Sequence, residues 1–186
     1  RGRELMTTRA ADTRAELPLI DIALAGNPNT GKSTVFNALT GLRQHTGNWP
    51  GKTVARAEGF FGHKDARYRL IDLPGTYSLR ATSVDEEVTR DYLLFDAPAC
   101  VVIVVDATAL ERNLHLALQV LQVTDRAVVC LNLMDEARKK AISIDTSALS
   151  ASLGVPVVPT AAISGVGLAD LRDAIHRVAS GSEQTE

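Results

Sequence analysis

Apolar runs alternate with stretches of helical periodicity along most of the chain. The runs that predict buried strands cover residues 19–25, 100–105, 127–133 and 155–158. The patterns that predict helices cover residues 32–40, 84–95, 110–121, 134–140, 146–153 and 168–178. Continuous apolar runs separated by helices are typical of parallel βαβ units whose sheet is buried on both faces. The alternation therefore predicts an α/β fold with a mostly parallel sheet and helices on both faces.

Two further predicted strands, at residues 52–61 and 67–72, follow one another without a helix between them. A short turn joins them, so we expect an antiparallel hairpin at one edge of the sheet. Residues 42–51, just before this hairpin, end in a segment with two glycines and a proline, and we expect no regular element there. The complete prediction is a six-stranded sheet with one antiparallel edge strand.

The length of 186 residues suits one compact domain, which we expect at residues 18–180. Residues 1–17 are polar and predict a flexible N-terminal tail, of which residues 1–5 precede Met6 and are expected to be a non-native remnant. Residues 181–186 predict a short C-terminal tail. The formal net charge is −2 and there is no basic run, which disfavours nucleic acid as a partner.

The first candidate site is the segment GNPNTGKS, which fits the phosphate-loop pattern GxxxxGK[ST] between a predicted strand and a predicted helix. Its glycines let backbone N–H groups point at a phosphate, and the helix N-terminus adds a positive partial charge. Lys32 is expected to reach the β- and γ-phosphates, and the Ser33 hydroxyl to bind Mg²⁺. The alternative is a glycine-rich turn without a ligand. The predicted nucleotide contacts here are Gly26, Asn27, Pro28, Asn29, Thr30, Gly31, Lys32, Ser33 and Thr34.

A second group of candidates follows about forty residues later, in the segment DLPG at the end of a predicted strand. Asp72 can hold Mg²⁺ through water, and the Gly75 N–H can reach the γ-phosphate. Thr53 is expected to complete the Mg²⁺ shell when the γ-phosphate is present, with Thr46 as the competing choice.

Base recognition is expected from the segment NLMD and the segment TAAI, which both follow predicted strands. Asp135 can accept hydrogen bonds from N1–H and the 2-amino group of guanine, which adenine cannot offer, and Asn132 would brace the loop. The alternative is that Asn132 and Asp135 only cap the next helix. In the second segment the backbone N–H of Ala162 is expected to approach guanine O6. The remaining predicted nucleotide contacts in these two segments are Leu133, Ala161 and Ile163.

This ordered set of motifs resembles the translation-factor class of P-loop GTPases. With NWPGKTV and DLPGTYSL added, the chain resembles the cytoplasmic G domains of the bacterial ferrous-iron transport protein B family over about residues 19–179. Era-like and tRNA-modification GTPases share the phosphate loop but not the NWPG segment.

The resemblance implies a Mg²⁺-dependent GTPase on the cytoplasmic face of the bacterial inner membrane, joined to a membrane protein that takes up Fe²⁺. It implies as partners GTP or GDP, a helical regulatory domain and a membrane portion that would follow Glu186. Self-association stays open. The alternatives are a GTP/GDP-sensing module with negligible hydrolysis, or an Era- or tRNA-modification-type GTPase.

The resemblance also implies how hydrolysis proceeds. Thr76 stands where Ras-like proteins have the water-orienting glutamine. Asn29 matches an asparagine that binds K⁺ in potassium-activated relatives, and such a cation could neutralise charge between the β- and γ-phosphates. The alternative for Asn29 is an amide that stabilises the turn. The residues expected in catalysis are Asn29, Lys32, Gly51 and Thr53, and Lys52 is an additional predicted nucleotide contact.

Two consequences concern nucleotide exchange. Leu133 replaces the lysine of the usual NKxD motif, so we expect weaker nucleotide affinity and fast GDP release. Residues 42–53 and 74–82 are expected to change conformation with the γ-phosphate.

Overall fold

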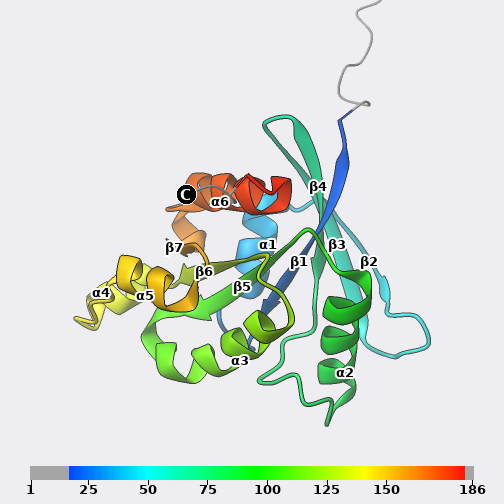
Figure 1. The fold of residues 1–186 in the computed structure, drawn as a ribbon, viewed down its shortest axis with the longest axis horizontal. Helices are drawn as coiled ribbons and strands as arrows, with labels where there is room; N and C mark the ends of the chain where they lie inside the picture. The colour runs from blue at the N-terminus through cyan, green and yellow to red at the C-terminus, as the bar shows by residue number, and fades with distance from the viewer. Residues whose placement is uncertain (1–16, 183–186) are drawn as a thin grey trace, which may run out of the picture.

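The computed structural model describes residues 17–182, which form alternating strands and helices (Figure 1). The strands are β1 (Leu19–Gly26), β2 (Gln44–Asn48), β3 (Ala55–His63), β4 (Ala66–Asp72), β5 (Cys100–Asp106), β6 (Ala127–Asn132) and β7 (Val157–Pro159). The helices are α1 (Lys32–Thr40), α2 (Val84–Asp91), α3 (Leu110–Val123), α4 (Met134–Lys139), α5 (Thr146–Leu153) and α6 (Leu168–Ser180). A π-helical turn, η2 (Tyr92–Asp96), continues α2, and 3₁₀ turns η3 (Ala107–Ala109) and η4 (Ala162–Ser164) precede α3 and α6.

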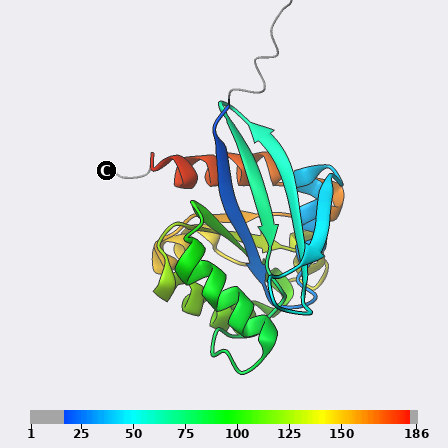
Figure 2. The ribbon, with the colours of Figure 1, turned by 90° about the vertical axis from the view of Figure 1, so that its right-hand side faces the viewer.

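All strands belong to one seven-stranded sheet with the order β2-β3-β4-β1-β5-β6-β7. Five strands, β4, β1, β5, β6 and β7 in sheet order, are parallel to one another, and in Figure 2 β1 (blue) lies beside the strands of the antiparallel edge. Each crossover between parallel strands carries a helix, as expected for buried parallel sheets. The carboxyl ends of β1, β4, β5 and β6 therefore meet at one end of the molecule, where ligands bind in such folds.

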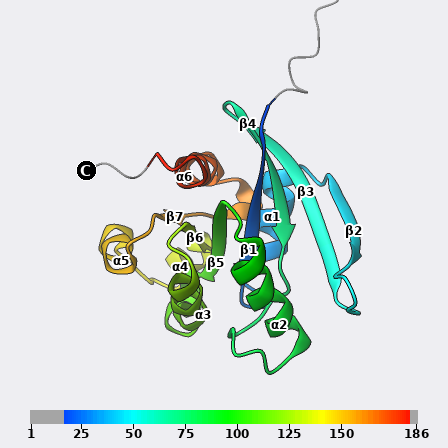
Figure 3. The same cartoon turned by 45° about the vertical axis from the view of Figure 1, so that its right-hand side comes forward.

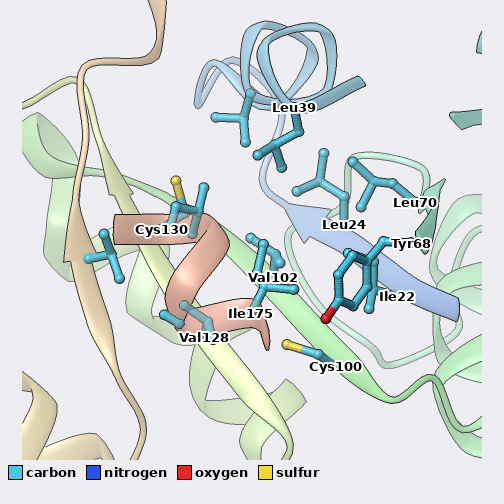
Figure 4. Close-up of a cluster of buried hydrophobic side chains, with 14 of the residues drawn as sticks. Ile22, Leu24, Leu39, Tyr68, Leu70, Cys100, Val102, Val128, Cys130 and Ile175 are labelled. Atoms are coloured by element: carbon cyan, nitrogen blue, oxygen red, sulfur yellow. The ribbon is translucent and has the colours of Figure 1, made fainter. Parts of the chain in front are cut away.

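Two hydrophobic cores cover the two faces of the sheet. Alternate residues of β1 point to opposite faces, so Ile22 and Leu24 pack under α1 and α6 whereas Ala23 and Ala25 pack under α2 and α3. Figure 3 shows α6 and α3 on opposite sides of β5 and β6. Figure 4 shows the first core, where Leu39 of α1 and Ile175 of α6 approach the strands.

The predicted fold class is confirmed, but the predicted number of strands was wrong. Residues 44–48, expected to be irregular, form the additional strand β2, which pairs antiparallel with residues 55–59 of β3. The sheet consequently has two antiparallel pairings, β2 with β3 and β3 with β4. All five residues of β2 are exposed, so the strand forms through backbone hydrogen bonds and carries no apolar alternation that could reveal it.

The predicted chain boundaries lie largely outside the described residues. Structure is described for only one residue of the predicted N-terminal tail and only the first two of the C-terminal tail, so those predictions stand as made. Within residues 17–182, no helix combines the length and the apolar character that crossing a bilayer requires.

Candidate functional site

The phosphate loop lies between the end of β1 at Gly26 and the start of α1 at Lys32. The Thr30 hydroxyl donates to the Asn27 carbonyl at 3.0 Å and closes the loop on itself. A side chain at position 26 would place its Cβ 2.8 Å from the Val104 carbonyl oxygen, and one at Gly31 would collide with the Asn132 amide. Gly31 also has a φ of 81°, so glycine is required there both for the conformation and for the space.

Lys32 joins the phosphate loop to the DLPG segment. Its ammonium donates to the Asp72 carboxylate and, at 2.8 Å, to the Leu73 carbonyl. Burial raises the pKa of the Asp72 carboxyl, and the neighbouring Lys32 charge opposes that shift. The structure thus brings together the predicted phosphate ligand and a predicted Mg²⁺ ligand. The predicted ligand Ser33 is exposed at the start of α1.

The residues after Asp72 also pack against the phosphate loop. The Thr76 N–H donates to the Gly26 carbonyl at 3.3 Å, and a Cβ at Gly75 would lie 3.4 Å from the Pro28 ring. Thr76 is 4% exposed, and its buried hydroxyl has no hydrogen-bond partner among the described residues. Gly75 and Thr76 are therefore placed where they could sense a terminal phosphate held by the loop.

Asn132, the last residue of β6, joins the phosphate loop to the segment after β7. Its amide nitrogen donates to the Thr30 carbonyl at 3.1 Å. Its amide oxygen accepts from the Thr160 hydroxyl and from the Ala162 N–H, both at 3.1 Å. The side chain is 1% exposed, so these bonds are made in a dry environment. Thr160 was not among the predicted contacts, although its place after a buried strand was a signal.

The remaining residues predicted to contact the base lie in the two segments that follow β6 and β7. Leu133 adopts a left-handed conformation with a φ of 63° and precedes α4, on which Asp135 lies. Asp135 Oδ1 is buried and has no hydrogen-bond partner in residues 17–182. Ala161 and Ala162 are buried, and Ile163 is 81% exposed. The Ala162 N–H, predicted to face guanine O6, is engaged by Asn132 in this conformation.

The side chains of the other predicted site residues take no part in these contacts. Gly51 and Thr53 are exposed, and Lys52 forms a 3.2 Å ion pair with Glu87 of α2. Thr46, the competing candidate, lies in β2 and is exposed. Asn29 is exposed with a φ of 64°, and its side chain makes no hydrogen bond within the part of the chain that is described. The amide of Asn29 is therefore not used to stabilise the turn.

The order and spacing of these loops match those of known proteins. The family model described as ferrous iron transport protein B matches residues 20–175. The chain belongs to this family. The G domain of the FeoB iron transporter of T. maritima has 43% sequence identity and a TM-score of 0.82, over 87% of this chain and 99% of that one. Membership of the FeoB family leaves the Era-like alternative without support.

Longer FeoB proteins match as well. The Fe(2+) transporter FeoB of Salmonella typhimurium is 48% identical over 85% of this chain but only 21% of its own length, so this chain spans about a fifth of that relative. The cytosolic domain of T. maritima FeoB has been solved in a GDP form, with 42% identity, a TM-score of 0.84 and coverage of 91% of this chain and 65% of that one. Its GMPPNP form has 44% identity, a TM-score of 0.83 and coverage of 86% and 64%.

Proposed function

We propose that this chain is a GTP-binding and GTP-hydrolysing domain that regulates or drives Fe²⁺ uptake by an attached inner-membrane transporter. The observation that carries the choice of nucleotide is the buried Asp135 Oδ1, which has no hydrogen-bond partner within residues 17–182 and lies three residues after the braced Asn132. A buried acceptor without a donor costs about 1–3 kcal/mol, which a ligand with matching donors recovers. Guanine supplies such donors at N1 and at its 2-amino group, whereas N1 of adenine is an acceptor that the carboxylate would repel.

The phosphates of GTP would lie over the loop at residues 26–33. The Lys32 ammonium would transfer from Asp72 to the β- and γ-phosphates, because a phosphate group offers it a stronger charge-assisted contact. Ser33, Asp72 and Thr53 carry the hydroxyl and carboxylate oxygens that Mg²⁺ prefers. Mg²⁺ bound there would neutralise phosphate charge during hydrolysis.

Hydrolysis requires a water that attacks the γ-phosphorus while the bond to the β–γ bridging oxygen breaks. Thr76 cannot orient that water as a glutamine side chain does, and the backbone of Gly51 is the proposed substitute. The exposed amide of Asn29 is available to bind K⁺, and a cation there would offset the negative charge that develops at the bridging oxygen.

Support for the guanine assignment also comes from the FeoB relatives, since the T. maritima cytosolic domain has been solved with GDP and with GMPPNP. The regulatory domain and the membrane portion that we propose as partners correspond to the part of the Salmonella relative that this chain does not span. We also propose that the domain lies on the cytoplasmic face of the membrane.

The experiment that tests the proposal is competition for a fluorescent guanine nucleotide on the purified chain with Mg²⁺. GTP and GDP should displace the label, and ATP should not do so at a thousandfold higher concentration, roughly the discrimination expected of a site built for hydrogen bonds. Equal displacement by ATP and GTP would contradict the role of Asp135.

A second candidate is a sensor that distinguishes GTP from GDP without appreciable hydrolysis. The observation that favours it is Thr76, because its hydroxyl is buried and the position lacks the glutamine side chain. The rate of phosphate release separates this candidate from the first.

A further inference from the structure

The ring of Trp49 packs between Tyr92 and Arg56, which belong to two elements outside the phosphate loop. This packing site is called the Tyr92–Arg56 seat. The Trp49 ring meets Tyr92 of the π-helical turn edge-on, with 5.5 Å between the ring centroids. The Arg56 guanidinium of β3 covers the ring at 4.6 Å from its centroid. Trp49 is only 7% exposed and belongs to the core on the α2 and α3 face of the sheet. A residue from an otherwise exposed segment is thus anchored in the interior.

The seat leaves the polar atom of Trp49 unsatisfied. The indole Nε1 is buried and has no hydrogen-bond partner among residues 17–182. Buried indole N–H groups ordinarily find an acceptor, and an unpaired one offsets part of the gain from burying the ring. A cavity of about 200 Å³, lined by Trp49, Val88, Tyr92 and Phe95 among others, lies beside the ring. The ring is therefore packed on two sides, but its N–H is not satisfied.

Two backbone hydrogen bonds join residues within the segment 49–54, here called the Trp49 loop. The Trp49 N–H donates to the Val54 carbonyl at 2.9 Å, and the Lys52 N–H donates to the Trp49 carbonyl at 3.0 Å. Thr53 lies within the Trp49 loop and is exposed. Because these bonds tie Thr53 to Trp49, a displacement large enough to bring Thr53 to the phosphates also pulls on the Trp49 ring.

We propose that Trp49 is a positioning residue that acts through Thr53: its ring leaves the Tyr92–Arg56 seat when Thr53 engages the γ-phosphate and Mg²⁺. This inference rests on the proposed GTP binding. Packing of Trp49 in the seat then competes with binding of Thr53 at the γ-phosphate. The stronger that packing is, the more of the γ-phosphate binding energy is used to release the ring. GDP, which has no γ-phosphate, leaves Trp49 in its seat.

The test uses the intrinsic fluorescence of Trp49, which is the single tryptophan of the chain. In the purified chain with Mg²⁺, saturating GMPPNP should shift the emission maximum to longer wavelength, because the ring moves from an apolar seat into water. Saturating GDP should leave the maximum unchanged. Binding of each nucleotide is measured in the same samples by displacement of a labelled guanine nucleotide.

Substitutions in the seat sharpen the test. Tyr92→Ala removes the edge contact and should shift the emission maximum before any nucleotide is added. It should also increase the affinity for GMPPNP about two- to tenfold, the change that the interaction energy of one aromatic pair corresponds to. The affinity for GDP should be unchanged. Tyr92→Phe keeps the ring and should behave as the wild type. Arg56→Ala should act in the same direction as Tyr92→Ala, and Arg67→Ala, which removes an exposed arginine at the far end of β4, is the control matched for charge.

Each outcome decides the matter. GMPPNP binding without a shift in emission, or an equal shift with GDP, overturns the inference about Trp49 and leaves GTP binding intact. Unchanged GMPPNP affinity in both Tyr92→Ala and Arg56→Ala would show that packing of Trp49 in the seat does not compete with binding of Thr53 at the γ-phosphate. Failure of GMPPNP and GDP to bind at all overturns the proposed function and this inference together.

Discussion

The two ends of the candidate nucleotide site are organised differently. At the base end, Asn132 makes three buried hydrogen bonds that join the phosphate loop, β6 and the loop after β7. At the γ-phosphate end, Thr53 is exposed and the Trp49 loop is anchored on the π-helical turn instead of the phosphate loop. Under the proposed function, the braced base end would select guanine without rearrangement, whereas the γ-phosphate end would respond to the phosphate by moving.

The segment from Gly75 onwards is held more firmly than the Trp49 loop but by fewer buried contacts than Asn132. Gly75 and Thr76 already touch the phosphate loop. The segment that follows is held by side chains: Glu86 accepts from the hydroxyls of Ser78 and Thr82, and Gln119 of α3 accepts from the Leu79 N–H at 2.6 Å. This segment is therefore held to α2 and α3 by side-chain contacts.

The largest expected effect comes from changing the base end itself. In Asp135→Asn the amide nitrogen becomes a donor, which fits the 2-oxo group of xanthine better than the 2-amino group of guanine. We expect the preference between GTP and XTP to change by roughly 10³–10⁵-fold in favour of XTP. Competition of the two nucleotides for a labelled site measures it, and an unchanged preference would show that Asp135 does not contact the base.

The brace at Asn132 should matter for stability as well as for binding. Asn132→Ala removes three hydrogen bonds and leaves the buried Thr30 carbonyl and Ala162 N–H without the partner they have here, whereas the Thr160 hydroxyl keeps contacts with Cys130 and Leu131. We expect the free energy of unfolding in urea to fall by about 2–4 kcal/mol. Thr53→Ala is the control from the other end of the site, and its effect should stay within about 0.5 kcal/mol because Thr53 is exposed. Equal losses in the two variants would remove the distinction between the rigid and the movable end.

The γ-phosphate end should respond to the monovalent cation. We expect GTP turnover in K⁺ to exceed turnover in Na⁺ by about tenfold or more, since a fixed cation offsets charge in the transition state. Asn29→Ala should remove the difference between the two salts while base selectivity stays intact. Equal wild-type rates in K⁺ and Na⁺ would rule out this role of Asn29.

The smallest expected effect concerns Glu86 and pH. Hydrogen bonds from Thr82 and Ser78 lower the pKa of the Glu86 carboxyl to about 2. A carboxyl whose pKa is lower in the folded state contributes stability above its unfolded pKa of about 4.5, and this contribution is lost as the pH falls towards 2. Glu86→Gln should therefore lose less stability than the wild type between these pH values in urea titrations. If the free energy of unfolding fell equally with pH in the two proteins, these hydrogen bonds would make no contribution to the pH dependence of stability.

The sequence predicted the fold class and most helix boundaries because their signals are local. The phosphate loop, the start of α1 at Lys32 and the bounds of α5 follow from glycine spacing and helical periodicity. The strand β2 was missed because its exposed polar side chains resemble those of a loop, and only pairing with β3 makes it a strand.

The sequence did not predict contacts between residues that are distant along the chain, because these contacts also depend on how elements pack together. The sequence placed Trp49 in an irregular segment, and its burial depends on Tyr92 and Arg56, which lie in two other elements. The Lys32–Asp72 ion pair and the bonds of Asn132 likewise join residues that are distant in sequence. The motifs identified which residues would meet at the site, but the partners of each side chain depend on how the loops pack.

Phosphate release from GTP by the purified chain, with Mg²⁺ and K⁺ present, tests the central claim most directly. We predict repeated turnover of GTP to GDP and phosphate, no release from ATP under the same conditions, and loss of GTP turnover in Lys32→Ala. Tight binding of GTP without phosphate release would contradict a hydrolysing domain and favour the sensor instead, and equal release from ATP would contradict the guanine site at Asp135.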